Sequence, residues 1–258
     1  MNSVRCLVLA VCLSVASLQV AFGKDIDQLD VPDMVGTLIT SVIRPGFAEL
    51  EQSASAMSQQ MQIYCEAPTS AGYSDVKEAF GGLVARWARV EFIRLGPLGA
   101  DNRLERMLFW PDRRGRGLKQ VRDIIRLEDT TAVEPDSLSQ KSVAVQGLLA
   151  LEYALFADGA EAGLSAANSH RCAYASAIAG AVAQLAGELN QLWLSESDTS
   201  ISHIWLNPSP TNALFRDEME QFSAVLRILG DGFEIVSHQR LEPILRDDIL
   251  DSSLKRDS

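Results

Sequence analysis

The sequence predicts an all-α protein built from antiparallel helical bundles. Apolar residues recur at seven-residue spacing, the predicted helices are joined mostly by short connections, and convincing strand alternation with hairpin turns is absent. Each apolar stripe must be buried against another, so helices of this kind pack side by side.

The first predicted helix contains an uninterrupted apolar stripe. Its residues follow a 4-3-4-3-4-3 spacing: Ile43, Phe47, Leu50, Ala54, Met57, Met61 and Tyr64. Pro45-Gly46 predicts a kink near the start and Ala67-Pro68 predicts the end, because proline disfavours the helix at its own position and at the residue before it.

Five further helices are expected along the chain. The first four cover about residues 74–95, 118–127, 136–159 and 168–193. The last one has an apolar stripe formed by Phe215, Met219, Phe222, Leu226, Leu229, Phe233 and Val236. We interpret the Met and aromatic stripes as bundle core. Residues 96–117 and 195–212 are irregular, and loops of that length are often packed over a functional site.

The N-terminus predicts export. A basic start that includes Arg5 precedes an uncharged run from Cys6 to Phe22, and Ala21-Phe22-Gly23 places small residues where a signal peptidase cuts. We expect a signal peptide over 1–23, cleaved near Gly23, and a periplasmic protein. An uncleaved anchor helix is the alternative. The helical domain then covers 24–245, and a polar tail covers 246–258.

The charge balance restricts the partners. Without the signal peptide, 22 basic residues stand against 34 acidic ones. This balance argues against nucleic acid or an anionic membrane as the main partner and suits a protein that handles cations. No segment after the signal peptide is long and apolar enough to span a bilayer.

Two cysteines, Cys65 and Cys172, remain after the signal peptide is removed. An even pair in an exported protein is most simply a disulfide. Here it would close a loop of about a hundred residues and tie the end of the first helix to the start of the fifth. A pair of metal or redox thiols is the alternative, but such thiols usually stand close together in sequence.

The fourth predicted helix contains the main candidate for a functional residue. Glu152 is the single acidic residue between Gly147 and Phe156, in a segment that is apolar on every face. We therefore expect a buried carboxylate, which is either functional or the structural partner of an arginine. Gly147, one turn earlier, would let another backbone or a ligand approach closely.

This segment also resembles a known family. Gly147-Leu148-Leu149-Ala150-Leu151-Glu152 is similar to the G-x-H-x-x-E signature of imelysin-like proteins, which are exported bacterial helical proteins. Three other segments resemble the family in the same order: Asp101 to Arg106, Phe109 to Gly115 with Trp110, Asp112 and Arg113, and His170 to Tyr174. The resemblance extends from about Asp33 to Leu245.

The resemblance implies two related helical bundles with a pocket where they meet. The signature glutamate and the Trp-Pro-Asp segment would lie near that pocket. The family is catalogued among metallopeptidases, and relatives are linked to iron uptake, including a periplasmic subunit of a ferrous-iron system. The chain departs from the pattern in two ways: Leu149 replaces the signature histidine, and the sequence stops soon after the sixth helix, so the second bundle is expected to be incomplete.

Other candidate groups are weaker. His170, His203 and His238 stand far apart and are interpreted as solvated or capping side chains. The arginines around Trp110 are either a solvated loop with ion pairs to Glu105 and Asp112, or a clamp for an anion. Fingerprints of serine hydrolases, P-loop proteins and dinucleotide-binding proteins are absent from the sequence.

Three functions remain after these exclusions. The first is a periplasmic binding protein linked to iron uptake, whose ligand is iron or a metal–organic anion complex. The candidate residues around this ligand are Glu152, Gly147, Trp110, Asp112 and Arg113, and Glu152 is the candidate ligand of the metal. The second is a metallopeptidase, against which Leu149 counts directly. The third is a non-catalytic interaction or scaffold protein. We prefer the first.

Overall fold

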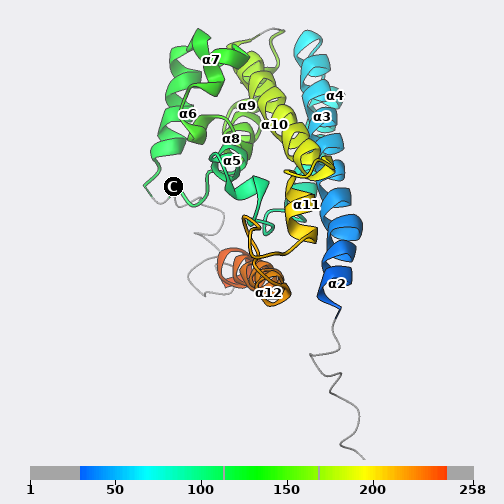
Figure 1. Cartoon of the computed structure of the whole chain (residues 1–258). Coiled ribbons are helices and arrows are strands. Elements are labelled where there is room, and N and C mark those ends of the chain that lie inside the picture. Colours follow the sequence, from blue (N-terminus) through cyan, green and yellow to red (C-terminus); the bar gives the residue numbers. More distant parts are fainter. Residues whose placement is uncertain (1–29, 113, 168, 243–258) are drawn as a thin grey trace, which may run out of the picture.

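The computed structural model describes residues 30–112, 114–167 and 169–242, and all regular structure in these ranges is helical (Figure 1). The predicted all-α class is therefore confirmed. The predicted signal peptide, the candidate Arg113 and the predicted tail lie outside the described ranges. None of the described helices is long and apolar enough to cross a membrane.

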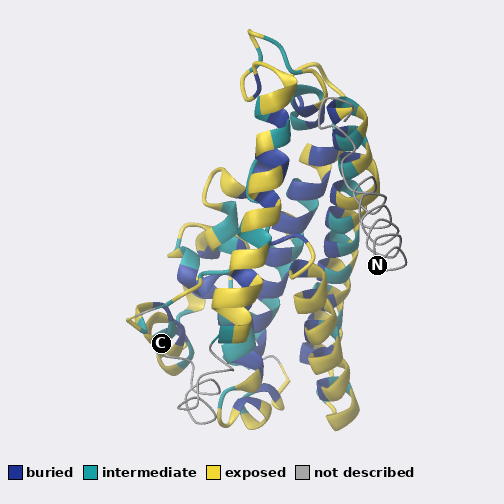
Figure 2. Ribbon diagram, turned by 90° about the horizontal axis from the view of Figure 1, so that it is seen from below, coloured by how far each residue is buried: buried dark blue, intermediate teal, exposed yellow. Residues whose placement is uncertain are grey.

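Three long helices form the centre of the molecule: α3 (Arg44–Glu66), α4 (Ser70–Trp87) and α10 (His170–Leu194). In Figure 1 they run side by side, and α3 packs most extensively against α10. All seven residues of the first predicted stripe are buried there, which confirms their assignment to the core. Figure 2 shows the same division, with buried residues on the facing sides of the helices and exposed residues outside.

The first helix starts earlier than predicted. α2 (Val31–Leu38) and a π-helical turn, η2 (Ile39–Ile43), precede α3 without a break. Pro45 lies in the first turn of α3, directly after the π-helical turn. Proline has no N–H to donate, so an irregularity of the helical hydrogen bonding at this point is expected.

The prediction of a single helix over 136–159 is wrong. This part of the chain forms α7 (Pro135–Ser139), a short 3₁₀ turn, η5 (Val143–Val145), and α8 (Leu148–Phe156). Polar side chains bind the backbone between them: Ser142 accepts from the amide of Ala144, and the Gln146 amide donates to the carbonyl of Lys141 at 2.7 Å. Such local bonds compete with continuous helix.

The two predicted irregular segments contain short helices. The first segment includes η3 (Pro97–Gly99) and α5 (Arg103–Met107) and leads into α6 (Arg116–Leu127). Between α6 and α7 lies η4 (Thr130–Ala132), and α9 (Ala160–Leu164) connects α8 to α10. The second segment includes α11 (Ile201–Leu206) and is followed by α12 (Glu218–Glu234) and a π-helical stretch, η6 (Ile235–Leu241).

Aromatic rings connect the second irregular segment to the core. Trp193 of α10 stacks on Phe47 with ring centres 6.2 Å apart, and Trp205 of α11 meets the same indole edge-on at 5.8 Å. Phe215 in turn contacts Trp205 at 5.4 Å. This chain of rings explains why Trp205 and Phe215 are buried although the segment around them is irregular.

The prediction that the last stripe belongs to the core is wrong for most of its residues. Phe215 is buried and Phe222 is partly buried, but the others are exposed: Met219, Leu226, Leu229, Phe233 and Val236. The opposite face of α12 packs on the body instead, through Gln221, Ala224, Val225 and Ile228. We call Met219, Phe222, Leu226, Leu229, Phe233 and Val236 the outer stripe.

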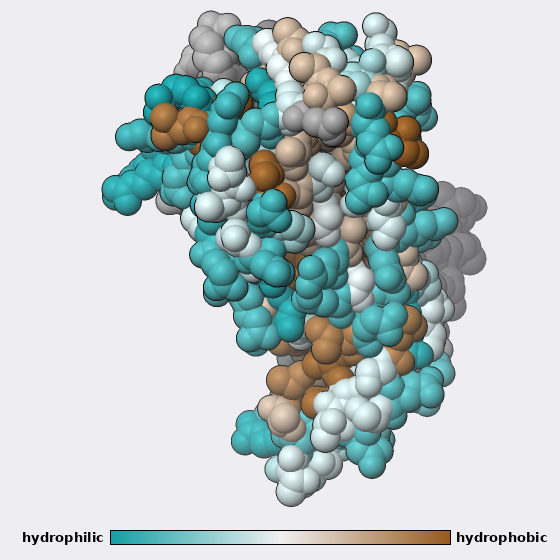
Figure 3. All heavy atoms as spheres, turned by 90° about the horizontal axis from the view of Figure 1, so that it is seen from above, coloured by the Kyte–Doolittle hydropathy of each residue, from teal (hydrophilic) through white to brown (hydrophobic). Residues whose placement is uncertain are grey.

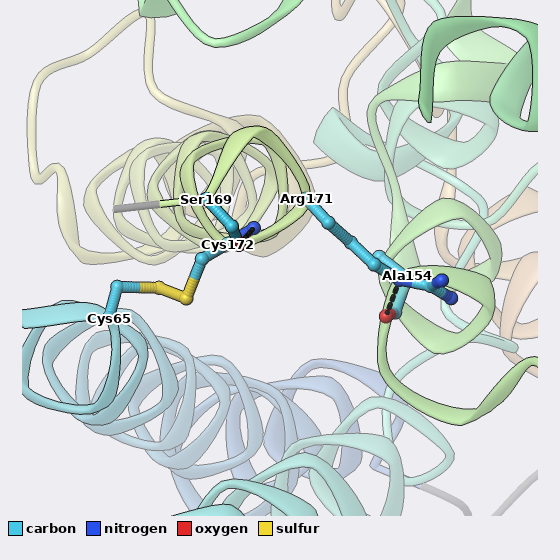
Figure 4. The surroundings of a disulfide bond; sticks show 5 residues. All are labelled: Cys65, Ala154, Ser169, Arg171 and Cys172. Atoms are coloured by element: carbon cyan, nitrogen blue, oxygen red, sulfur yellow. Dashed lines mark hydrogen bonds between the residues drawn. A yellow bond between two sulfur atoms is a disulfide. The ribbon is translucent and has the colours of Figure 1, made fainter. Parts of the chain in front are cut away.

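The predicted disulfide between Cys65 and Cys172 is confirmed (Figure 4). Cys65 lies in the last turn of α3 and Cys172 in the first turn of α10, with Cα atoms 5.6 Å apart. Ser169 caps α10 by accepting from the amide of Cys172. The bond therefore connects the ends of the two helices that form most of the core.

Hydrophilic side chains cover most of the face seen in Figure 3, and the hydrophobic side chains on that face gather toward its lower part.

Candidate functional site

The helix that contains Glu152, α8, has one buried face and one partly open face. Leu148, Ala150, Leu151, Ala154 and Leu155 are buried, whereas the opposite side presents Leu149, Glu152, Tyr153 and Phe156. Glu152 is only partly buried, so the prediction of a fully buried carboxylate is wrong. The apolar residues on that face indicated burial, but no other helix covers the face completely.

Gly147 begins α8 at a point of close backbone approach. A Cβ atom at this position would lie 2.5 Å from the carbonyl oxygens of Arg106 and Met107. Real Cβ atoms do not approach oxygen so closely, so glycine is required here. Of the two roles expected for Gly147, the structure shows the approach of another backbone.

The other end of α8 is fixed by two side chains from elsewhere in the chain. Arg171 Nε donates to the carbonyl of Ala154 at 2.9 Å (Figure 4). The same guanidinium donates to the carbonyl of Tyr153 at 3.1 Å. The Tyr73 hydroxyl donates to the carbonyl of Leu155 at 2.7 Å. Together they satisfy the last carbonyls of the helix, which have no partner within it. Burial lowers the pKa of the Arg171 guanidinium.

Asp112 organises the start of α6. Its two carboxylate oxygens accept from the backbone amides of Arg116 and Leu118, both at 3.0 Å. A negative charge at this end of a helix is favourable because the first amides are unpaired. Gly117 allows the tight packing, since a Cβ there would lie 2.8 Å from the Cβ of Ala144 and 3.1 Å from the Asp112 carboxylate.

A small, mostly apolar cavity of about 30 Å³ lies between α8, α6 and the Trp-Pro-Asp segment. Leu149 and Ala150 line it from α8, and Trp110 and Asp112 line it from the segment before α6. The remaining lining residues are Phe109, Gly117, Leu118, Val121 and Ala144. The structure thus brings Trp110 and Asp112 to the residue that stands in place of the signature histidine.

Glu152 does not line this cavity. It follows Leu149 by three residues, so the two side chains lie on the same face of α8, one turn apart. Tyr153 is next to it, and its ring lies 5.6 Å from the guanidinium carbon of Arg122 on α6. The candidate site is therefore an apolar cavity with one carboxylate in its wall and a second carboxylate one helical turn away.

The donor set does not fit a metallopeptidase centre. A catalytic zinc ion usually has three protein ligands, and Leu149 offers no donor atom. In residues 30–112, 114–167 and 169–242, no three side chains of His, Cys, Asp or Glu lie close enough to hold a metal ion. Any cation at this site would need further oxygen ligands from water or from an organic chelator.

The other predicted groups do not join the cavity. Arg103 pairs with Asp101 at 3.0 Å and donates to the carbonyl of Pro97, rather than pairing with Glu105 or Asp112. His170 contacts the carbonyl of Asp129 through Nε2 at 3.0 Å, and His238 contacts Glu242 at 3.0 Å. The exposed His238 agrees with the interpretation as a solvated side chain, whereas His170 packs on a distant segment, with its Nδ1 atom buried.

A second polar group was missed in the sequence. Asp129 accepts from Lys141 Nζ at 2.8 Å and from the hydroxyl and amide of Thr131. The hydrogen bonds from Lys141 and Thr131 lower the pKa of the Asp129 carboxyl to about 2. Its partner Lys141 is twelve residues away, and the spacing of the two residues contains no recognisable motif.

Comparison with known proteins gives three matches. A family model described as Imelysin matches residues 43–253. Iron-regulated protein A from Synechococcus elongatus is 27% identical over 146 residues, which is 57% of this chain and 37% of that protein. The crystal structure of an imelysin-like protein from Psychrobacter arcticum 273-4 matches 80% of this chain and 61% of its own, with a TM-score of 0.64 and 18% identity.

The structural match confirms the fold, and at 18% identity it shows the fold alone. This chain spans little more than a third of the length of the curated relative and less than two thirds of the solved one.

Proposed function

Since this chain belongs to the imelysin family, we propose that it is an exported binding protein for iron, taken up as the cation or as a complex with a small organic acid. The observation that carries the proposal is the meeting of Trp110, Asp112 and Leu149 at one cavity, with Glu152 one turn along the same helix. The relative in Synechococcus elongatus is named for its regulation by iron, which supports a link to that metal.

The chemistry of the site suits such a ligand. Ferrous and ferric ions are bound well by carboxylate oxygens, and two carboxylates leave coordination positions for the oxygens of an organic acid. The cavity of about 30 Å³ has room for a group the size of a water molecule. An organic acid would therefore lie outside it, against the exposed part of the Trp110 side chain. The acidic balance of the whole chain favours the approach of a cation.

The disulfide between Cys65 and Cys172 supports export of the protein. Disulfides form and persist outside the cytoplasm, where the glutathione and thioredoxin systems do not reduce them. The Cys65–Cys172 bond agrees with the sequence signal for export at residues 1–23. We propose that the binding protein works in the periplasm, without the first 23 residues.

The test is calorimetric titration of ferrous ion under anaerobic conditions, and of ferric citrate, with zinc ion as the comparison. The proposal predicts saturable binding of an iron species that is at least tenfold weaker in Glu152→Gln. Glu196→Gln, at an exposed position before α11, is the matched control and should bind as the unchanged protein does. Absence of saturable iron binding, or equal binding in the two variants, would contradict the proposal.

A second variant examines the position of the lost histidine. Leu149→His would place an imidazole three residues before Glu152, so that both side chains lie on one face of α8. Imidazole is a good zinc ligand, and we expect zinc affinity to rise at least tenfold in this variant. Cleavage of an unfolded protein substrate by the unchanged chain, abolished by a chelator, would instead favour the metallopeptidase alternative.

A further inference from the structure

Among the described residues, the outer stripe along α12 and the continuous η6 is the largest group of exposed apolar side chains on one stretch of helix. Met219 is 59% exposed, Phe233 is 75% exposed, and Leu226, Leu229 and Val236 are each at least half exposed. Soluble proteins usually bury residues of this size, and a contiguous patch of them marks an interaction surface. Figure 1 shows α12 at one end of the molecule, away from the packed group of α3, α4 and α10.

Specific contacts fix the orientation of α12. The Gln221 side chain is completely buried and donates to the carbonyl of Trp205. Arg240 donates to both oxygens of the buried Glu91 carboxylate, at 2.8 and 3.0 Å. A rotation that buried the outer stripe would break both contacts and leave Glu91 without its cation, at a high cost in free energy. The stripe is therefore held outward.

The spacing of the outer stripe fits another helix. Its residues follow a 3-4-3-4-3 pattern from Met219 to Val236, which is the spacing of a seam between two packed helices. An amphipathic helix that lies on a membrane surface has a basic polar face, whereas the charged neighbours here include Glu218, Asp231 and Glu234. The pattern favours a protein partner.

We propose that the outer stripe is the interface of a homodimer, in which α12 and η6 of two copies pack antiparallel about a two-fold axis near Gly230. In this arrangement Leu226 lies opposite Phe233 of the second copy, and Phe222 lies opposite Val236. A Cβ placed on Gly230 meets no atom within 4 Å in one copy, so the two backbones can approach there. The same surface serves both copies, as in most two-fold dimers.

The charges beside the stripe agree with this pairing. The antiparallel register places Arg227 of each copy opposite Glu234 of the other, which gives two symmetric ion pairs. Neither side chain forms a salt bridge within the described part of one chain, where the nine salt bridges involve other residues. At about 150 to 200 Å² for a side chain of this size, the exposed fractions amount to roughly 600 Å² per copy. The total of roughly 1,200 Å² for two copies reaches the lower end of the range for specific, stable interfaces.

The test is sedimentation velocity of the purified protein between 1 and 100 µM. The proposal predicts a concentration-dependent dimer whose dissociation constant rises at least tenfold in Phe233→Glu. The control is Ile63→Glu, which places the same charge on a residue of α3 that is 54% exposed and outside the stripe. Both positions are exposed, so thermal melting should show that both variants fold.

Charge exchange distinguishes the antiparallel dimer from other modes of self-association. Arg227→Glu and Glu234→Arg should each weaken the dimer three- to tenfold, and the two changes together should restore it. A monomer throughout the concentration range would overturn the proposal, as would a dimer that Phe233→Glu leaves intact. Binding of a monomer to anionic phospholipid vesicles would assign the stripe to a membrane surface and overturn it as well. The proposal does not depend on iron binding.

Discussion

The position of Gly147 next to the carbonyls of Arg106 and Met107 leads to a prediction for stability. In Gly147→Ala the new methyl group would lie 2.5 Å from two backbone oxygens that belong to another segment. We expect the free energy of unfolding to fall by about 2 to 3 kcal/mol, since an overpacked site must displace backbone. Chemical denaturation monitored by circular dichroism measures it.

Gly81→Ala is the matched control for this change. Gly81 lies inside α4, and a Cβ there meets nothing within 4 Å. Alanine should stabilise the helix by about 0.5 to 1 kcal/mol relative to glycine. Equal effects of the two substitutions would show that the contact at Gly147 has no energetic importance.

Asp129 leads to a prediction for the dependence of stability on pH. Its folded-state pKa is lowered from 3.8 to about 2, first by the hydrogen bond from Lys141 and then by the one from Thr131. The ionised carboxylate therefore stabilises the folded state above about pH 4, and this contribution is lost as the pH falls from about 4 to 2. With a third of the side chain exposed, screening reduces the contribution to about 1 kcal/mol.

The measurement is urea denaturation of the unchanged protein and of Asp129→Asn at several pH values. The difference between them should be constant above pH 5 and shrink toward zero near pH 2. Thr131→Val removes one of the two side-chain donors and should show a smaller effect over the same range. A difference that does not change with pH would mean that the Asp129 carboxylate is not stabilised by these contacts.

At the level of helices and their connections, the disulfide is the strongest single constraint on the core. Cys65 and Cys172 are 107 residues apart, so reduction frees a long loop in the unfolded chain. The loop-entropy relation gives a loss of about 5 kcal/mol in the free energy of unfolding. Thermal melting with and without dithiothreitol measures it, and a Cys65→Ala/Cys172→Ala variant should be insensitive to the reductant. If dithiothreitol also destabilised that variant, the loss of stability would not come from reduction of this disulfide.

The success of sequence reasoning differs from helix to helix, for physical reasons. The stripe of α3 has a matching neighbour in α10, so periodicity was sufficient to place Phe47, Leu50 and Met57 in the core. The same periodicity in α12 has no neighbour in the described chain, and there it marks an exposed surface instead. A helical period shows that a face is apolar, but tertiary packing decides which face is covered.

The break between α7 and α8 could not be read from periodicity. Ser142 and Gln146 bind the backbone locally, and Gly147 packs against a segment forty residues earlier. The partial exposure of Glu152 has the same origin, because burial depends on which elements lie opposite. The family resemblance placed Glu152 and the Trp-Pro-Asp segment at one pocket. Trp110 and Asp112 do line a common cavity, together with Leu149, but Glu152 lies one helical turn away from it.

For the molecule as a whole, two features suggest functions in addition to the stability of the packed bundle. One is the cavity where the Trp-Pro-Asp segment meets α8, which we assign to an iron species. The other is the outer stripe, which we assign to a second copy of the chain. They lie on different elements, so a dimer without iron binding, or iron binding by a monomer, would separate the two proposals.

Trp110 provides the most direct test of iron binding at the cavity. Trp110 is 37% exposed and lines the cavity, whereas Trp87, Trp193 and Trp205 are buried in the core. Iron bound beside an indole quenches its fluorescence, so titration with ferric citrate or anaerobic ferrous ion should give a saturable loss of emission. The measurement compares the unchanged protein with Trp110→Phe, which corrects for absorption by the ligand. We predict that the saturable component disappears in Trp110→Phe; equal quenching in both proteins, or none in either, would contradict the account.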